Sequence, residues 1–235
     1  MQDFLAKKPA ICAAVMESSV EDFLRTVKKI EGADLVEIRI DGLKEPSPQK
    51  VKGLLKGVRD EIDLSIILTN RKGDEGGSFA GGEEKRIGTI KECMGLADAI
   101  DIELGTERRY RDEIVEAAKG MDAPVIISYH DFVNTPGEGE MQKLLEEEFE
   151  IGADVAKLAV MPNSKSDVLR LLSVTQRTSK LGNVCTISMG GMGKISRILA
   201  PFFGSCMTYA SVGTPTAPGQ MSVSEIREIW KILGV

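Results

Sequence analysis

The chain has 235 residues, of which 42% are hydrophobic and 28% are charged, and its net charge is -6 at pH 7. This length suffices for a domain with a substantial core, and no apolar run approaches the roughly 20 residues of a membrane-spanning helix, so we expect a cytoplasmic protein. The acidic balance and the lack of a basic stripe argue against nucleic acid and favour a small-molecule partner.

Short apolar runs of strand length recur along the chain and alternate with charged segments of helical length. The runs lie at 10–16, 34–40, 64–70, 99–104, 124–130, 154–160, 183–189 and 205–211. Capping boxes are expected at Ser18 with Glu21 and at Ser222 with Glu225, each ahead of an amphipathic segment. The alternation predicts a single (β/α)8 barrel over residues 1–235, with an open doubly wound sheet as the alternative.

Alternation inside the predicted strands places polar residues on a common face. In a barrel this face points into the lumen, and the carboxyl ends of the strands form the mouth. Half-buried antiparallel strands with a solvated face are the alternative, but they fit helical connections poorly. The expected lining of the mouth is Glu37, Arg39, Arg71, Glu103, His130 and Lys157.

Lys157 lies at the centre of an apolar strand, ADVAKLAVMP (153–162). Burial and neighbouring arginines should lower its pKa and leave a neutral amine, which attacks ketones. A structural ion pair with Glu37 or Glu103 is the alternative interpretation.

His130 is the only histidine, which excludes a metal site built from several histidines. It is suited to relay protons near neutral pH, or else it is a hydrogen-bonded core residue. Glu75 is the predicted partner that orients its imidazole. Imine formation on Lys157 followed by proton abstraction is therefore a coherent mechanism. The cysteines are isolated, and we interpret them as reduced, buried thiols; they are Cys12, Cys93, Cys185 and Cys206.

Glycine-rich segments follow three of the predicted strands, at 71–77, 188–194 and 214–221. We expect them to form loops that approach a ligand. The GGMGK stretch in the second of them superficially suggests phosphate binding but fits neither G-x-x-x-x-G-K-[ST] nor G-x-G-x-x-G, and a mobile loop is the alternative.

Several motifs follow one another from the second predicted strand to near the C-terminus. They are EIR (37–39), TNRKGDEGG (69–77), DIEL (101–104), SYHDF (128–132), VAKLA (155–159), SMGGMGKISR (188–197) and APGQ (217–220). In this order they resemble the type I 3-dehydroquinate dehydratase (3-dehydroquinase) family. The resemblance implies a (β/α)8 barrel of the shikimate pathway that dehydrates 3-dehydroquinate to 3-dehydroshikimate without metal or organic cofactor.

The same resemblance implies roles for particular residues. Lys157 would form the iminium, His130 would act as general base and acid, and Glu75 would hold the His130 ring. The expected substrate-binding residues are Glu37, Arg39 and Arg71 for the ring hydroxyls, Met189 for the ring face, and Arg197, Thr216 and Gln220 for the carboxylate. Thr216 stands where relatives often carry serine and keeps the hydroxyl. Segment 216–220 would be a lid, and the protein would be a homodimer.

Two alternative functions fit parts of the sequence. A class I aldolase or transaldolase also uses a Schiff-base lysine on the sixth strand of a barrel. It would normally need a phosphate site after strands seven and eight, where Arg197 and Gln220 suit a carboxylate better. A barrel that binds a small anion without catalysis would leave Lys157 and His130 without a role.

Overall fold

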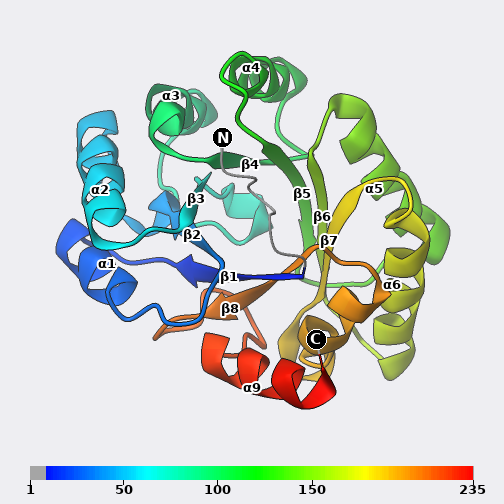
Figure 1. The fold of residues 1–235 in the computed structure, drawn as a ribbon. Coiled ribbons are helices and arrows are strands. Elements are labelled where there is room, and N and C mark those ends of the chain that lie inside the picture. The colour runs from blue at the N-terminus through cyan, green and yellow to red at the C-terminus, as the bar shows by residue number, and fades with distance from the viewer. Residues whose placement is uncertain (1–8, 235) are drawn as a thin grey trace.

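The computed structural model describes residues 9–234, and Figure 1 shows its strands forming a central ring that the helices surround. The strands are β1 (Ala10–Val15), β2 (Leu35–Arg39), β3 (Ser65–Thr69), β4 (Ala99–Glu103), β5 (Val125–Asp131), β6 (Val155–Val160), β7 (Asn183–Ser188) and β8 (Met207–Ser211). The α-helices are α1 (Val20–Val27), α2 (Pro48–Glu61), α3 (Glu83–Cys93), α4 (Arg108–Lys119), α5 (Glu138–Ile151), α6 (Lys165–Thr178), α7 (Gly190–Gly193), α8 (Ser196–Leu199) and α9 (Val223–Leu233). The 3-10 helices are η1 (Ile40–Gly42), η2 (Gly73–Glu75), η3 (Met94–Leu96) and η4 (Ala200–Phe203). Within residues 9–234, none of these helices combines the length and the apolar character that crossing a bilayer requires.

The strands form one parallel sheet in the order β7, β6, β5, β4, β3, β2, β1, β8. The two ends of this order meet, because the Cys206 N–H donates to the Val184 carbonyl at 2.7 Å and Val184 pairs with Ser205 in a parallel bridge. The sheet therefore closes almost completely. This confirms the predicted (β/α)8 barrel and excludes the open doubly wound sheet.

Local signals set the helix starts, with one correction. Ser222 and Glu225 form the predicted capping box of α9. The prediction for Ser18 was wrong by one residue: Ser19 caps α1, and its side chain accepts from the Asp22 N–H at 3.1 Å. Ser18 instead accepts from the Lys44 N–H through its carbonyl, which ties it to the loop after β2.

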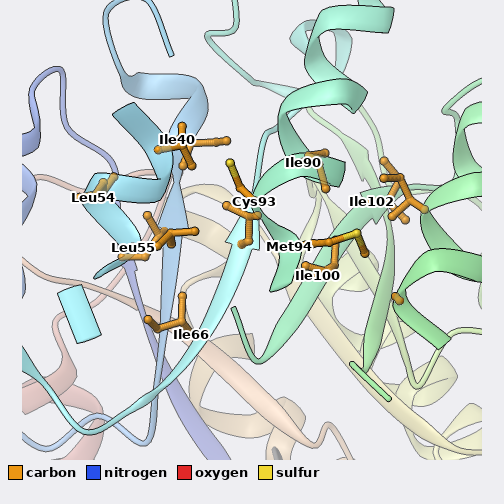
Figure 2. Packing of buried hydrophobic residues seen from close by; sticks show 14 of the residues in the cluster. Ile40, Leu54, Leu55, Ile66, Ile90, Cys93, Met94, Ile100 and Ile102 are labelled. Atoms are coloured by element: carbon orange, nitrogen blue, oxygen red, sulfur yellow. The ribbon is translucent and has the colours of Figure 1, made fainter. Parts of the chain in front are cut away.

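The layer between strands and helices is apolar. Figure 2 shows Ile66 and Ile100 of the strands facing Leu54 and Leu55 of α2 and Ile90 of α3, all of them fully or almost fully buried. Burying each such side chain stabilises the fold by about 1.5 to 3 kcal/mol. This layer fixes the helices around the barrel and so fixes the direction in which each strand points its other face.

The lumen has an apolar floor and a polar upper layer. Leu35, Ile67, Ile126 and Val155 belong to one buried cluster inside the barrel. Two residues further along the same strands, toward their carboxyl ends, the inward positions are polar: Glu37, Thr69, Ser128 and Lys157. The predicted alternation of inward and outward residues is thereby confirmed.

Candidate active site

One cavity opens above the polar layer and encloses about 480 Å³, counting its open mouth. The residues predicted to be catalytic or substrate-binding all line it: Glu37, Arg39, Arg71, Glu75, His130, Lys157, Met189, Arg197, Thr216 and Gln220. Residues without a predicted role also line it: Gly76, Phe132, Ala159, Ile187, Tyr209 and Ala217. The fold thus brings together residues from both halves of the chain.

Lys157 is buried and paired with carboxylates. Its Nζ lies 2.8 Å from Asp101 Oδ2 and 3.6 Å from Glu37 Oε1. Glu37 was one of the two partners considered from the sequence, whereas the closer partner, Asp101, was not. Strand register alone would favour Glu103, because Lys157 lies beside Ser128 and Ser128 lies beside Glu103 on β4, whereas the side-chain contact is made with Asp101, one inward position earlier.

The prediction that the pKa of Lys157 falls was wrong. Burial does favour the neutral amine, but Asp101 and Glu37 outweigh burial and the repulsion from Arg71, so the pKa of Lys157 lies above its ordinary value. Burial acts against the charged form of Asp101 as well. Arg71 and Lys157 nevertheless hold the pKa of Asp101 far below its usual range. The resting lysine is therefore an ammonium.

His130 and Glu75 form the predicted pair. The Glu75 Oε2 atom lies 2.9 Å from His130 Nδ1 and also accepts from the His130 backbone N–H at 2.9 Å. Burial, aided by Arg71 and Lys157, lowers the pKa of His130 well below its usual value, so the imidazole is neutral. A neutral ring that donates from Nδ1 to an ionised Glu75 leaves Nε2 free to accept a proton. Burial raises the pKa of Glu75 to about 7.

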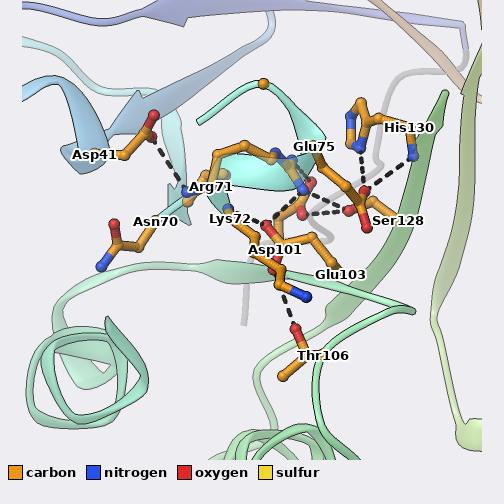
Figure 3. Close-up of polar contacts among 12 residues, drawn as sticks. Asp41, Asn70, Arg71, Lys72, Glu75, Asp101, Glu103, Thr106, Ser128 and His130 are labelled. Atoms are coloured by element: carbon orange, nitrogen blue, oxygen red, sulfur yellow. Dashed lines mark hydrogen bonds and ion pairs between the residues drawn. The ribbon is translucent and has the colours of Figure 1, made fainter. Parts of the chain in front are cut away.

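Behind the cavity, Arg71 links two buried acidic residues (Figure 3). Its Nη2 lies 2.9 Å from Asp101, and its Nη1 donates to Glu103 at 3.0 Å and to Ser128 at 2.7 Å. Glu103 also accepts from Arg86 at 2.8 Å. The Glu103 carboxylate therefore pairs with Arg71 and Arg86 and does not line the mouth of the cavity, contrary to our expectation.

Arg197 is buried without an acidic partner in the described part of the chain. Its guanidinium donates to three backbone carbonyls: those of Tyr209 and Gly219 at 3.0 Å each and that of Pro218 at 3.1 Å. Burial lowers the pKa of Arg197 to about 10. A guanidinium has five N–H donors, so two remain for a ligand, and an anion would relieve the cost of this buried charge.

Segment 214–220 lies directly against the loop after β7. The Gly190 N–H donates to the Pro218 carbonyl at 3.1 Å. Gly219 has a φ of +73°, and a Cβ there would lie 2.2 Å from the Gly190 carbonyl oxygen, so only glycine fits. Gln220 and Thr216 stabilise the segment from within, since Gln220 Nε2 donates to Thr216 Oγ1 at 3.0 Å and its Oε1 accepts from the Thr216 N–H at 2.6 Å.

Two residues that contact Lys157, namely Asp101 and Tyr209, escaped sequence reasoning. Asp101 and Glu103 alternate on the same face of β4, and nothing in that pattern tells which carboxylate reaches the lysine. Tyr209 shares the inward face of β8 with Met207 and Ser211. Its inward parity was the only available signal, and a lone aromatic residue in a strand is usually a core residue.

The chain is similar to known proteins over nearly its whole length. The model of the family described as type I 3-dehydroquinase matches residues 11–235. A 3-dehydroquinate dehydratase from Methanosarcina barkeri is 45% identical, with 97% of this chain and 96% of that protein covered. The crystal structure of 3-dehydroquinate dehydratase from Geobacillus kaustophilus has a TM-score of 0.93 at 29% identity and covers 97% of this chain and 92% of that one. The type I enzyme from Clostridium difficile, with covalent modified comenic acid, has a TM-score of 0.90 at 34% identity, with 96% and 92% covered.

Proposed function

This chain belongs to the type I 3-dehydroquinase family, and from this membership we propose that it dehydrates 3-dehydroquinate to 3-dehydroshikimate through an imine on Lys157. The whole chain, residues 1–235, is then one catalytic domain. The observation that carries the proposal is a cavity that a buried lysine, a neutral histidine and an arginine without an acidic partner among residues 9–234 all line.

Lys157 attacks the C3 ketone of the substrate, and the resulting iminium acidifies the protons at C2. His130 accepts and returns protons through Nε2 during imine formation and protonates the C1 hydroxyl as it leaves. Glu75 holds the ring by its contact of 2.9 Å with Nδ1, which fixes the tautomer. Since Lys157 rests as an ammonium, the first step must be the loss of a proton from its nitrogen, for which we assign His130 as the acceptor. This transfer is uphill in the resting site, because the pKa of His130 is lowered and that of Lys157 is raised.

The substrate carboxylate binds Arg197, with Thr216 and Gln220 next to it. Support comes from the two unused N–H donors of Arg197 and from its lack of a carboxylate partner within residues 9–234. A planar guanidinium binds a carboxylate through two parallel hydrogen bonds. Glu37, Arg39 and Arg71 bind the ring hydroxyls, and Met189 packs against the ring.

The imine is tested by adding borohydride during turnover. The hydride reduces the iminium to a stable secondary amine, so the substrate mass should be found on the peptide that contains Lys157. Lys157→Ala should show no adduct and no product absorbance, whereas Lys180→Ala, an exposed control, should behave as the wild type. Turnover without any adduct in the wild type would refute the imine mechanism.

The carboxylate site is tested with Arg197→Gln, which removes the charge and keeps hydrogen-bond donors. KM for 3-dehydroquinate should rise by about 10- to 100-fold, in line with the roughly 1.5 to 3 kcal/mol of a charged hydrogen bond. A substrate analogue without the carboxylate should bind the variant and the wild type equally. An unchanged KM would contradict the assigned role.

We also propose that the enzyme is a cytoplasmic homodimer. The family resemblance supports this, and the buried, free thiols of Cys12, Cys93 and Cys185 are compatible with a reducing compartment. Light scattering on the purified protein should give twice the mass of the chain, and a monomer at assay concentration would contradict the homodimer.

A further inference from the structure

Tyr209 lies beside the reactive nitrogen of the cavity. It is on the inward face of β8, next to Cys12 of β1, and only 4% of its surface is exposed. The Nζ atom of Lys157 lies over its ring, 4.1 Å from the ring centroid. This is closer than the roughly 6 Å at which a cation and an aromatic face begin to attract each other appreciably.

The ring, and not the hydroxyl, makes this contact. The Tyr209 hydroxyl is sealed from solvent and has no hydrogen-bond partner within residues 9–234. Burial and the nearby Glu37 raise the pKa of Tyr209 well above its usual value, so the phenol is neutral. A neutral aromatic ring presents a negative face, which attracts a cation more strongly where water is excluded.

We infer that Tyr209 is a further catalytic residue, whose ring face stabilises the positive charge that develops on the Lys157 nitrogen as the neutral carbinolamine becomes the iminium. The inference rests on the imine mechanism proposed above. The amine adds to the carbonyl carbon, and the oxygen leaves as water with one proton from nitrogen and one from a general acid. Nitrogen then carries a double bond to carbon and a positive charge. The neutral carbinolamine that precedes the iminium gains nothing comparable from the ring, so the ring favours the charged states.

Tyr209 also connects the two halves of the site. Its backbone carbonyl accepts from Arg197 Nη1 at 3.0 Å, while its side chain faces Lys157. One residue therefore sets the spacing between the imine nitrogen and the arginine assigned to the substrate carboxylate. Side-chain substitutions leave the backbone contact in place, so the effect of the ring can be measured separately.

The decisive experiment replaces Tyr209 by phenylalanine and then by phenylalanines carrying one, two and three fluorines. Each fluorine weakens the negative face while the ring keeps nearly its size. The measured quantities are kcat and the fraction of enzyme trapped by borohydride on Lys157 at saturating 3-dehydroquinate. Relative to Tyr209→Phe, both should fall stepwise with each fluorine. In Tyr209→Leu, which has no ring, kcat should be about 5- to 30-fold lower than in Tyr209→Phe, the range expected for a buried cation over a ring.

Controls separate this inference from a packing effect and from the mechanism itself. The same fluorinated residues at Phe202, exposed on η4, should change neither quantity. If kcat and the trapped fraction stay the same in all fluorinated variants at position 209, the role of the ring is overturned while the imine mechanism stays in place. A wild type that forms no adduct would instead refute the mechanism. If Tyr209→Leu unfolds, the fluorinated series, in which ring volume is nearly constant, still decides the question.

Discussion

Asp101 is the carboxylate on which the charge balance of the lumen depends, and Asp101→Asn removes its charge while keeping its shape. The side chain accepts from Ser128 Oγ at 2.7 Å and pairs with Lys157 Nζ at 2.8 Å and Arg71 Nη2 at 2.9 Å. Removing one partner of a buried ion pair leaves the other charge uncompensated, which costs about 3 to 5 kcal/mol. Folded domains are stable by about 5 to 15 kcal/mol, so the variant should fold but be much less stable.

Urea unfolding measures this loss directly. Ser128→Ala is the matched control, because it removes a neutral partner of the same carboxylate and should cost only about 0.5 to 1.5 kcal/mol. The pKa of Asp101 is lower in the folded chain than its ordinary value of 3.8, so its contribution to stability is present above that pH and declines as the pH falls through the folded pKa. The difference between wild type and Asp101→Asn should therefore be constant near neutral pH and shrink in acid.

The same substitution should change the chemistry. Without Asp101, burial and Arg71 act on Lys157 mainly against Glu37, so the pKa of Lys157 should fall. Borohydride trapping should then extend to lower pH than in the wild type. A loss of stability below about 1 kcal/mol together with an unchanged pH profile of trapping would refute our account of the lumen charges.

Three further predictions concern other parts of the chain. Glu148 of α5 is fully buried, and burial outweighs the opposing effect of the Lys157 backbone N–H and raises the pKa of Glu148 well above 4.5. Its protonated form therefore stabilises the fold below pH 4.5, and this contribution is lost by about 1.4 kcal/mol per pH unit as the pH rises toward the folded pKa. Urea titrations should show that the free energy of unfolding declines less with rising pH in Glu148→Gln than in the wild type. If Glu148→Gln behaves like the exposed control Glu147→Gln, this account is contradicted. Gly219→Ala should displace segment 214–220 and raise KM about 10-fold or more. Gly213→Ala is the control, because it has the same backbone strain but no atoms close to the added Cβ, and it should leave KM unchanged. Equal KM values for the two variants would show that the contact of Gly219 with Gly190 is unimportant. Because the pKa of Glu75 is about 7, kcat/KM should rise with pH through that region, and Glu75→Gln should abolish this rise; its persistence would assign the ionisation to another group.

The sequence by itself determined the order of the strands and the face on which each polar residue lies. Side chains alternate strictly along a strand, and helical connections make the sheet parallel, so Lys157 and His130 had to point into one lumen. The recurring apolar runs were enough to predict the barrel. The helix caps were predicted less accurately, as Ser18 and Ser19 show, because two adjacent serines offer the same local signal.

Only the tertiary structure decided which charges meet. Alternation gives the face of a residue but not its depth in the barrel, and depth follows from the register of strands that are distant in sequence. Asp101 reaches Lys157 across 56 residues of chain, while Glu103, two positions further on, turns to Arg71 and Arg86. The apolar sequence neighbours of Lys157 indicated a lowered pKa, but the pKa is raised, because electrostatic energy depends on distances in space and not on distances along the chain.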